Sequence, residues 1–291
     1  MIKRYTQQLL KRLHIYERLK ASHLYDLYWK IADPSVVDAR NREIAFYRNT
    51  LAGFRKGLVI FDIGANDGYK TTIFLRLGAR VVAVDPDEAN VRILSEKFCR
   101  GRLFKKPVSI VGKAVSDHQG TAVFWIDRPG RTQNTLSQKW VEVLRDDQSR
   151  FKFHHTFGGK KEVATVTLQG LISAYGMPFF VKIDIEGYEL NALKGLQTPV
   201  PYLSFELNLP EFSLEGLECI SVLEQLAPRG SFNYVIGGRT ELAMEQWVRA
   251  DEFRDILRDC THRAIEVFWQ NQIGASITTA SMTAQSTIFQ L

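Results

Sequence analysis

The sequence has few cysteines and no long apolar run. Its three cysteines, Cys99, Cys219 and Cys260, lie far apart among 291 residues and lack the spacing of metal ligands. We therefore expect reduced, buried thiols in a cytoplasmic protein. No run approaches the roughly 18–20 apolar residues of a membrane-spanning helix, and charges interrupt the region where a secretory signal would be apolar. With 45% apolar residues, the composition is typical of a soluble globular domain.

A broad excess of positive charge is also missing. The formal net charge is +6, but residues 1–20 hold six basic side chains and one acid, and the rest of the chain holds 32 basic and 31 acidic groups. A nearly neutral body lacks the basic surface that duplex nucleic acids need, so we expect no nucleic-acid partner. The amphipathic basic helices predicted in residues 1–30 suggest a peripheral contact with an anionic membrane or a protein. The alternative is a helix packed on the domain with its basic face solvated.

From residue 58 onward, apolar runs typical of strands alternate with segments typical of helices. The expected strands are residues 58–61, 81–84, 108–115, 121–126, 163–167, 179–183, 202–207, 232–236 and 265–269. Strands alternating with helices predict a doubly wound, mainly parallel α/β sheet of Rossmann-like type. We divide the chain into an N-terminal helical extension (1–55), one α/β domain (56–271) and a polar C-terminal tail (272–291). A polar insertion is expected at 127–162.

The strongest local signal is a glycine turn between the first strand and its helix, FDIGANDG at residues 61–68. Glycines there let the backbone approach a ligand, and the amides at the helix N-terminus are free to bind it. A dinucleotide fingerprint needs G-x-G-x-x-G, but Asn66 stands in place of the second glycine. Asp62 would repel a pyrophosphate and attract the ammonium and sulfonium of S-adenosylmethionine, which has no phosphate. The alternative is a tight turn without a ligand.

An acidic residue, Asp85, ends the second strand 23 positions after Asp62. A carboxylate at this place can accept hydrogen bonds from both hydroxyls of an adenosine ribose. Its alternative role is to cap the helix that follows Pro86. The turn and the acid, in this order and spacing, favour a ribose-bearing ligand without phosphate.

A second group of acids follows a buried strand at residues 179–189, FFVKIDIEGYE. Ligands of open α/β sheets bind beyond the carboxyl ends of the strands, so Asp184 and Glu186 should face the same crevice as the glycine turn. Glu206 ends the next strand and can reach the same space. Carboxylates there can take the proton of an acceptor hydroxyl or orient it. Alternatively, Glu186 and Glu189 only stabilise the start of the next helix, which we favour for Glu189.

Together these motifs resemble the FkbM family of methyltransferases. The resemblance runs from about residue 58 to 269 and is carried by residues 62–68, 85–86, 114–117, 167–168, 182–189, 193–195 and 205–206. It implies the seven-stranded sheet of class I methyltransferases, S-adenosylmethionine as methyl donor and, usually, O-methylation of a hydroxyl on a sugar, polyketide or related metabolite. Two residues depart from the family pattern. Asp67 replaces an apolar residue, and Asp85 is one methylene shorter than the commoner glutamate.

The resulting hypothesis is O-methyl transfer to a small-molecule or glycan acceptor. We assign no metal ligand and take Asp184 and Glu186 as catalytic candidates. The residues predicted to bind S-adenosylmethionine are Asp62, Gly64, Ala65, Asn66, Gly68, Asp85, Val115 and Ser116, the last two by analogy to the fold. An N-methyltransferase would use the same cofactor site, and a catalytically silent adenosyl-binding or interaction protein would keep it without turnover. His154 or His155 is the next candidate for a base.

Overall fold

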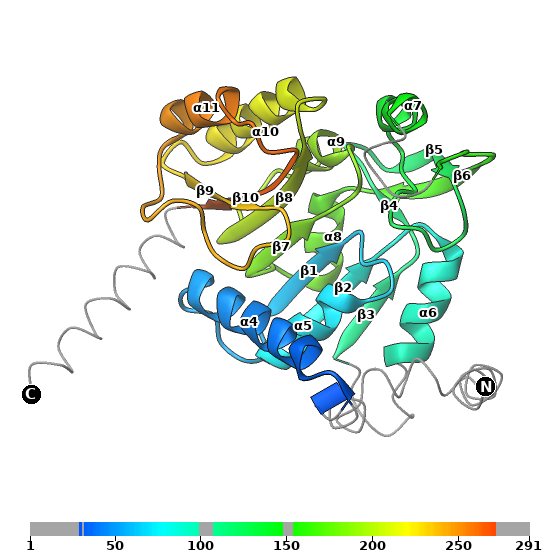
Figure 1. Ribbon diagram of the computed structural model, residues 1–291, viewed down its shortest axis with the longest axis horizontal. Helices are drawn as coiled ribbons and strands as arrows, with labels where there is room; N and C mark the ends of the chain where they lie inside the picture. Colours follow the sequence, from blue (N-terminus) through cyan, green and yellow to red (C-terminus); the bar gives the residue numbers. More distant parts are fainter. Residues whose placement is uncertain (1–28, 31, 99–106, 148–153, 272–291) are drawn as a thin grey trace, which may run out of the picture.

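A seven-stranded, mostly parallel sheet forms the centre of the molecule (Figure 1). The structure is a computed structural model that describes residues 29–30, 32–98, 107–147 and 154–271. The strands of this sheet are β1 (Val59–Ile63), β2 (Arg80–Val84), β3 (Val108–Val111), β7 (Phe180–Ile183), β8 (Tyr202–Asn208), β9 (Ser231–Ile236) and β10 (Ala264–Gln270). Their order is β3-β2-β1-β7-β8-β10-β9, and only β10 runs antiparallel to its neighbours. This is the predicted Rossmann-like sheet of class I methyltransferases.

The order of the strands reverses beside β1. β1 pairs in parallel with β2 on one side and with β7, which comes more than 100 residues later, on the other. The helices that follow β1 and β7 therefore leave the sheet in opposite directions, and a crevice opens beyond the carboxyl ends of these strands. The glycine turn after β1 and the acids after β7 meet at this point.

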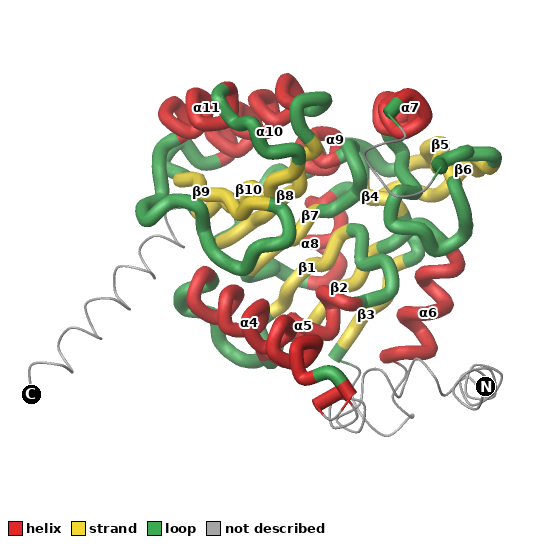
Figure 2. Tube along the Cα trace, viewed as in Figure 1, coloured by secondary structure: helices red, strands yellow, loops and turns green. Residues whose placement is uncertain are grey.

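Helices cover both faces of the sheet (Figure 2). They are α4 (Pro34–Thr50), α5 (Tyr69–Leu77), α6 (Glu88–Phe98), α7 (Gln138–Asp146), α8 (Leu168–Tyr175), α9 (Glu189–Lys194), α10 (Ser213–Leu226) and α11 (Ala250–Arg258). One apolar core lies between the sheet and α4 and α5, and a larger one between the sheet and α7 to α11. Because side chains alternate along a strand, buried residues such as Phe180 and Val181 enter opposite cores.

The segment predicted as one strand at 108–115 divides into two. β3 ends at Val111, and the chain turns at Gly112 and Lys113 into β4 (Ala114–Val115). β4 belongs to a separate three-stranded sheet with β6 (Gly159–Val166) and β5 (Gly120–Ile126), in the order β4-β6-β5. Pairing with β6, a partner distant in the sequence, draws β4 away from the central sheet, which the apolar run alone does not reveal.

The predicted polar insertion contains a helix that the sequence analysis missed. Within 127–162, α7 is capped by the Ser137 side chain, which accepts a hydrogen bond from the Trp140 amide. Trp140, Val141 and Leu144 are buried on one face of this helix. Their three- and four-residue spacing was therefore a helical signal within a mostly polar segment.

The N-terminal part of the described chain is joined to the α/β domain by its packing. Ile44, Tyr47 and Leu51 at α4 pack against Phe74 and Phe180 in one core. The boundary at residue 55 stays a prediction. The predicted basic helices of residues 1–28 and the tail at 272–291 lie outside the described residues. Among the described helices, none has the length and apolar character needed to cross a membrane.

Candidate active site

A cavity of about 220 Å³ lies at the point where the strand order reverses. We call it the first cavity. Its walls come from the glycine turn, the ends of β2, β7 and β8, the start of the small sheet and residues 131–136 of the insertion. The position agrees with the rule that ligands of open α/β sheets bind beyond the carboxyl ends of strands.

The glycine turn closes one side of this cavity because it approaches β7 very closely. Gly64 has a φ of +81°, which favours glycine, and a Cβ added to it would lie 1.8 Å from the Asp184 carbonyl oxygen. The amides of Gly64 and Ala65 both donate to the carbonyl of Val84, at 2.9 and 3.0 Å, and so tie the turn to β2. A side chain at Gly64 would therefore push apart the two strand ends that form the site.

On the β2 side of the first cavity, Asp85 is held as a hydrogen-bond acceptor. Its carboxylate receives the amide of Asn66 at 2.8 Å, the amide of Asp87 at 2.9 Å and the side-chain amide of Asn90 at 3.2 Å. Burial raises the pKa of Asp85 to about 6, although these hydrogen bonds act to lower it. A carboxylate so placed can accept further hydrogen bonds from a ribose.

One polar atom in the same wall has no hydrogen-bond partner among the described residues. It is the Oδ1 of Asn90, a residue that is 3% exposed and lines the first cavity. A buried acceptor without a donor costs free energy, so this wall is suited to a ligand that donates hydrogen bonds. Adenosine, with ribose hydroxyls and an exocyclic amine, carries such donors, and the residues present therefore fit an adenosyl group.

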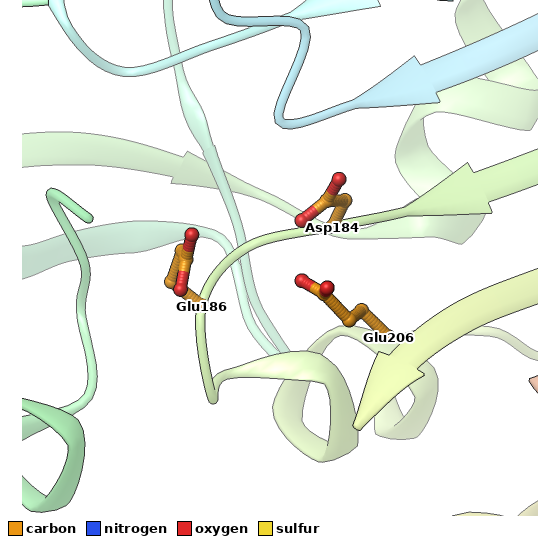
Figure 3. A group of neighbouring side chains, drawn as sticks. All are labelled: Asp184, Glu186 and Glu206. Carbon is orange, nitrogen blue, oxygen red and sulfur yellow. The ribbon is translucent and has the colours of Figure 1, made fainter. Parts of the chain in front are cut away.

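Three carboxyl groups gather on the opposite side of the first cavity. Asp184, Glu186 and Glu206 each place a carboxylate oxygen within 4.8 Å of the others (Figure 3). The Nζ of Lys182 lies 2.7 Å from Asp184 and supplies a positive charge to the group. Burial acts to raise the pKa of Asp184, but Lys182 outweighs it and the pKa lies below its usual range.

The neighbouring carboxyl group of Glu206 behaves in the opposite way. Burial and the charges of Asp184 and Glu186 raise its pKa well above the usual range. Of this pair, Asp184 is therefore the group that favours the ionised form, and Glu206 is the group that favours the protonated form. The three oxygens could also converge on a cation, but the Lys182 ammonium already balances one of their charges.

Glu186 occupies an unusual backbone conformation that aims its side chain into the first cavity. Its φ is +57°, in the left-handed region that a residue with a Cβ rarely adopts. The hydroxyl of Thr135 donates to its carbonyl at 2.7 Å, and the indole N–H of Trp140 donates to its carboxyl at 2.9 Å. Burial, together with the charges of Asp184 and Glu189, raises the pKa of Glu186 to about 8.

We expect Trp140→Phe to shift the pH dependence of the methyl transfer that the sequence predicts. Phenylalanine can keep the edge contact with Phe212, whose ring centre lies 5.7 Å away, but it removes the N–H that favours the ionised form of Glu186. The pKa of Glu186 should rise further, and the limb of the pH–rate profile that it governs should move up by about one pH unit. The measurement is single-turnover methyl transfer across pH. Trp125→Phe, in β5, is the matched control, and superimposable profiles for Trp140→Phe and wild type would contradict this role.

The structure brings most of the predicted site residues together. Those that line the first cavity are Gly64, Asn66, Asp85, Val115, Asp184 and Glu186. Those outside its lining are Asp62, Ala65, Gly68 and Ser116. The carboxylate of Asp62 is 1% exposed and accepts the Thr71 hydroxyl at 2.5 Å, and its residue lies opposite Lys182 in the β1–β7 pairing.

Glu189 has the structural position that we favoured for it. It starts α9, and its carboxyl accepts the amides of Ile185 and Gly187 at 3.0 and 3.3 Å. It therefore supports the turn that carries Glu186. Neither His154 nor His155 lines the first cavity. His154 is exposed, whereas the buried His155 places its Nδ1 3.4 Å from Asp127.

The sequence analysis missed the part of the insertion that covers the first cavity. The amide of Gly130 and the side-chain amide of Asn134 both donate to Asp87, at 2.7 and 2.8 Å, and hold the segment against the start of α6. Arg131 and Thr132, between them, line the cavity. The only signal in the sequence was the length and polarity of the insertion, since Asp87 is more than 40 residues away.

The solved structures that are similar to this chain have low sequence identity to it. Precorrin-6y C5,15-methyltransferase from Geobacter metallireducens is 8% identical, with 79% of this chain and 86% of that chain covered and a TM-score of 0.38. The plantazolicin methyltransferase BpumL, solved in complex with SAH, is 11% identical, with 91% and 99% covered and a TM-score of 0.35. At such scores the strand order, rather than either neighbour, identifies the fold. No curated protein matches the sequence.

A family model gives the assignment that these structures do not. The model of the methyltransferase FkbM domain matches residues 62–264, which span the glycine turn, the acids after β7 and the start of β10. The matched range contains five strands of the central sheet completely: β2, β3, β7, β8 and β9. It also includes the last two residues of β1 and the first residue of β10. The chain belongs to the FkbM family of S-adenosylmethionine-dependent methyltransferases.

Proposed function

We propose that this methyltransferase is an O-methyltransferase that acts on a hydroxyl of a sugar, polyketide or related metabolite. The observation that carries the proposal is the Asp184 carboxylate, which Lys182 keeps ionised at the edge of the first cavity. A hydroxyl oxygen must lose its proton when it is methylated, and an ionised carboxylate can accept that proton. A neutral amine can attack through its lone pair before it loses a proton, so N-methylation has less need of this group.

The first cavity is the proposed binding site of S-adenosylmethionine, which supplies an electrophilic methyl group on a sulfonium. Asp85 and Asn90 would receive hydrogen bonds from the adenosine part, and Val115 would contact its base. Gly64 and Asn66 would border the methionine part, at the turn between β1 and α5. The predicted contact of Asp62 with the ammonium remains part of this proposal, although Asp62 stands behind the cavity wall.

In the proposed reaction Asp184 accepts the proton of the acceptor hydroxyl as the new bond forms. Glu186 is protonated near neutral pH, since its pKa is about 8, and it can donate a hydrogen bond that orients the acceptor oxygen. Lys182 holds Asp184 in place through the 2.7 Å ion pair. Residues 131–136 exclude water from the adenosyl side, which favours alignment of the reacting atoms.

The cofactor site can be tested by affinity. S-adenosylmethionine should raise the melting temperature of the protein, whereas NAD should not. Asp85→Ala should weaken binding by about 1–3 kcal/mol, because it removes charge-assisted hydrogen bonds. Since the ionised carboxylate is the better acceptor, affinity of the wild type should also fall as the pH drops below about 6. Calorimetric titration measures both, with Asp38→Ala, exposed on α4, as the control. If Asp85→Ala binds S-adenosylmethionine with unchanged affinity, Asp85 only caps the helix that follows it.

The type of reaction can be tested by the product. Extracts incubated with methyl-labelled S-adenosylmethionine should yield a labelled methyl ether, which nuclear magnetic resonance distinguishes from a methylamine. A labelled N-methyl product would replace the proposal with its alternative. Binding without any conversion to S-adenosylhomocysteine would instead indicate a catalytically silent protein.

A further inference from the structure

A second cavity, of about 280 Å³, lies beside the first. Asp184 and Glu206 line both cavities, so the two meet at the acids after β7 and β8. The second cavity is bounded by α4, the start of α5, the β7, β8 and β10 strands and the loop at 237–240 after β9. A group bound in it would face the same carboxylate as the contents of the first cavity.

We propose that the second cavity is the acceptor site and that it takes a neutral ring rich in hydroxyls. The inference rests on the proposed function, because it needs the methyl donor in the first cavity. Methyl transfer requires the acceptor oxygen to lie beside both the methyl group and its proton acceptor. The wall that the two cavities share, at Asp184, is where these conditions can be met together.

The charges of the second cavity are balanced within it. Lys70 forms an ion pair with Glu43, and Lys182 forms one with Asp184. The Ser204 hydroxyl donates to Glu266 at 2.7 Å. The lining holds four carboxyl groups and three basic groups, and the raised pKa of Glu206 favours the neutral form of that carboxyl group. Such a surface offers many hydrogen-bond donors and acceptors but does not compensate a charge on the ligand, so it suits neutral hydroxyls.

The wall of the second cavity also has apolar side chains, those of Phe46, Val235 and Ile265. A saturated ring with hydroxyls on its edge presents apolar C–H groups on its face, and this wall can pack against them. At about 280 Å³ the cavity is larger than the first one, and it has room for at least one such ring.

The rival is an anionic acceptor. Arg239 lies exposed at the rim, and the described residues form no ion pair with its side chain. A carboxylate or phosphate on the acceptor could bind there. The experiment must therefore compare neutral and charged rings of the same size.

The probes are methyl-labelled S-adenosylmethionine and three sets of monosaccharides: methyl hexopyranosides, hexuronates and aminohexoses. We expect a labelled methyl ether from at least one neutral pyranoside, and turnover of the charged rings slower by about tenfold or more. Product from the charged rings alone, or from none of the sugars while S-adenosylhomocysteine still binds, would overturn the assignment. Loss of S-adenosylhomocysteine binding would instead overturn the proposed function.

Variants of residues that line the second cavity test whether the accepted sugar binds there. Glu266→Gln should raise its KM by about tenfold or more, because a charged acceptor of hydrogen bonds is lost. Thr240→Trp, at the exposed rim, should block entry, and both variants should keep the wild-type affinity for S-adenosylhomocysteine and the melting temperature. Glu241→Gln makes the same charge change outside the cavity lining and should behave as wild type. Wild-type KM in both Glu266→Gln and Thr240→Trp would place the acceptor elsewhere.

Discussion

Asp184→Asn should lower the rate of methyl transfer by about 10²- to 10⁴-fold, the range for loss of a general base. Asparagine has nearly the same shape but cannot accept the proton of the acceptor hydroxyl. Asp184 lies at the common edge of both cavities, and its amide, which donates to the Ile63 carbonyl at 3.0 Å, is unaffected by the substitution. The backbone of the site and most of the cofactor affinity should therefore remain, although the folded state should lose stability because the buried Lys182 loses its ionised partner. Single-turnover transfer and calorimetric binding, measured on the same preparation, separate these effects.

Two further variants make the result specific to Asp184. Glu186→Gln should reduce the rate by an intermediate amount if Glu186 orients the acceptor, or should mainly lower stability if it only supports the turn before α9. Glu218→Gln, on the surface of α10, is the control for loss of a carboxylate. If Asp184→Asn turns over like wild type, the acceptor is activated by another group or loses its proton directly to water. The two histidines of the insertion do not line the cavities, so neither is in a position to replace Asp184.

Lys182→Met should destabilise the folded state by about 3 kcal/mol, the lower end of the range for breaking a buried ion pair. Lys182 is 3% exposed in the central strand β7, between the carboxylates of Asp184, to which it is bonded, and Asp62, whose residue lies opposite it on β1. Methionine fills a similar volume but leaves both acids without their nearest cation. Asp184 is partly open to the cavities, so the loss should stay below the maximum for a fully buried pair. Denaturant unfolding measures the difference.

The destabilisation of Lys182→Met should depend on pH in a defined direction. Without the ammonium, burial should raise the pKa values of Asp62 and Asp184 above those in the unfolded chain. Groups with raised pKa values in the folded state contribute less stability as the pH rises, so the loss should be larger at pH 8 than at pH 5. Lys194→Met removes a surface partner of Glu218 and should change stability by about 0–1 kcal/mol. An equal loss in the two lysine variants would contradict the role assigned to Lys182.

Local signals in the sequence were enough to predict the central sheet and part of the lining of the first cavity. The alternation of apolar runs and helical segments predicted the strands around β1 and β7. The spacing of apolar residues, and the glycines and prolines that end an element, can both be recognised from neighbouring positions in the sequence. The glycine at residue 64 and the acids at 85 and 184 follow strands directly. Parallel strands bring such positions to one edge, so their convergence on the first cavity could be predicted.

Tertiary structure decided the features that depend on residues far apart in the chain. Trp140 and Glu186 are 46 residues apart, and no local pattern indicates that an indole from the insertion binds this carboxyl. Likewise, the small sheet forms only because β4 pairs with β6.

The sequence by itself determined the fold class, the family and the group of acids that lines the first cavity. Only the tertiary structure decided which acid favours the ionised form and that a second cavity lies beside the first. The physical reason is that a pKa depends on every charge and dipole packed around the group, and a cavity on walls from several elements. In the sequence, Lys182 is one polar residue within an apolar strand. In the fold, it lowers the pKa of Asp184 and lines the second cavity together with residues of α4, β8 and β10.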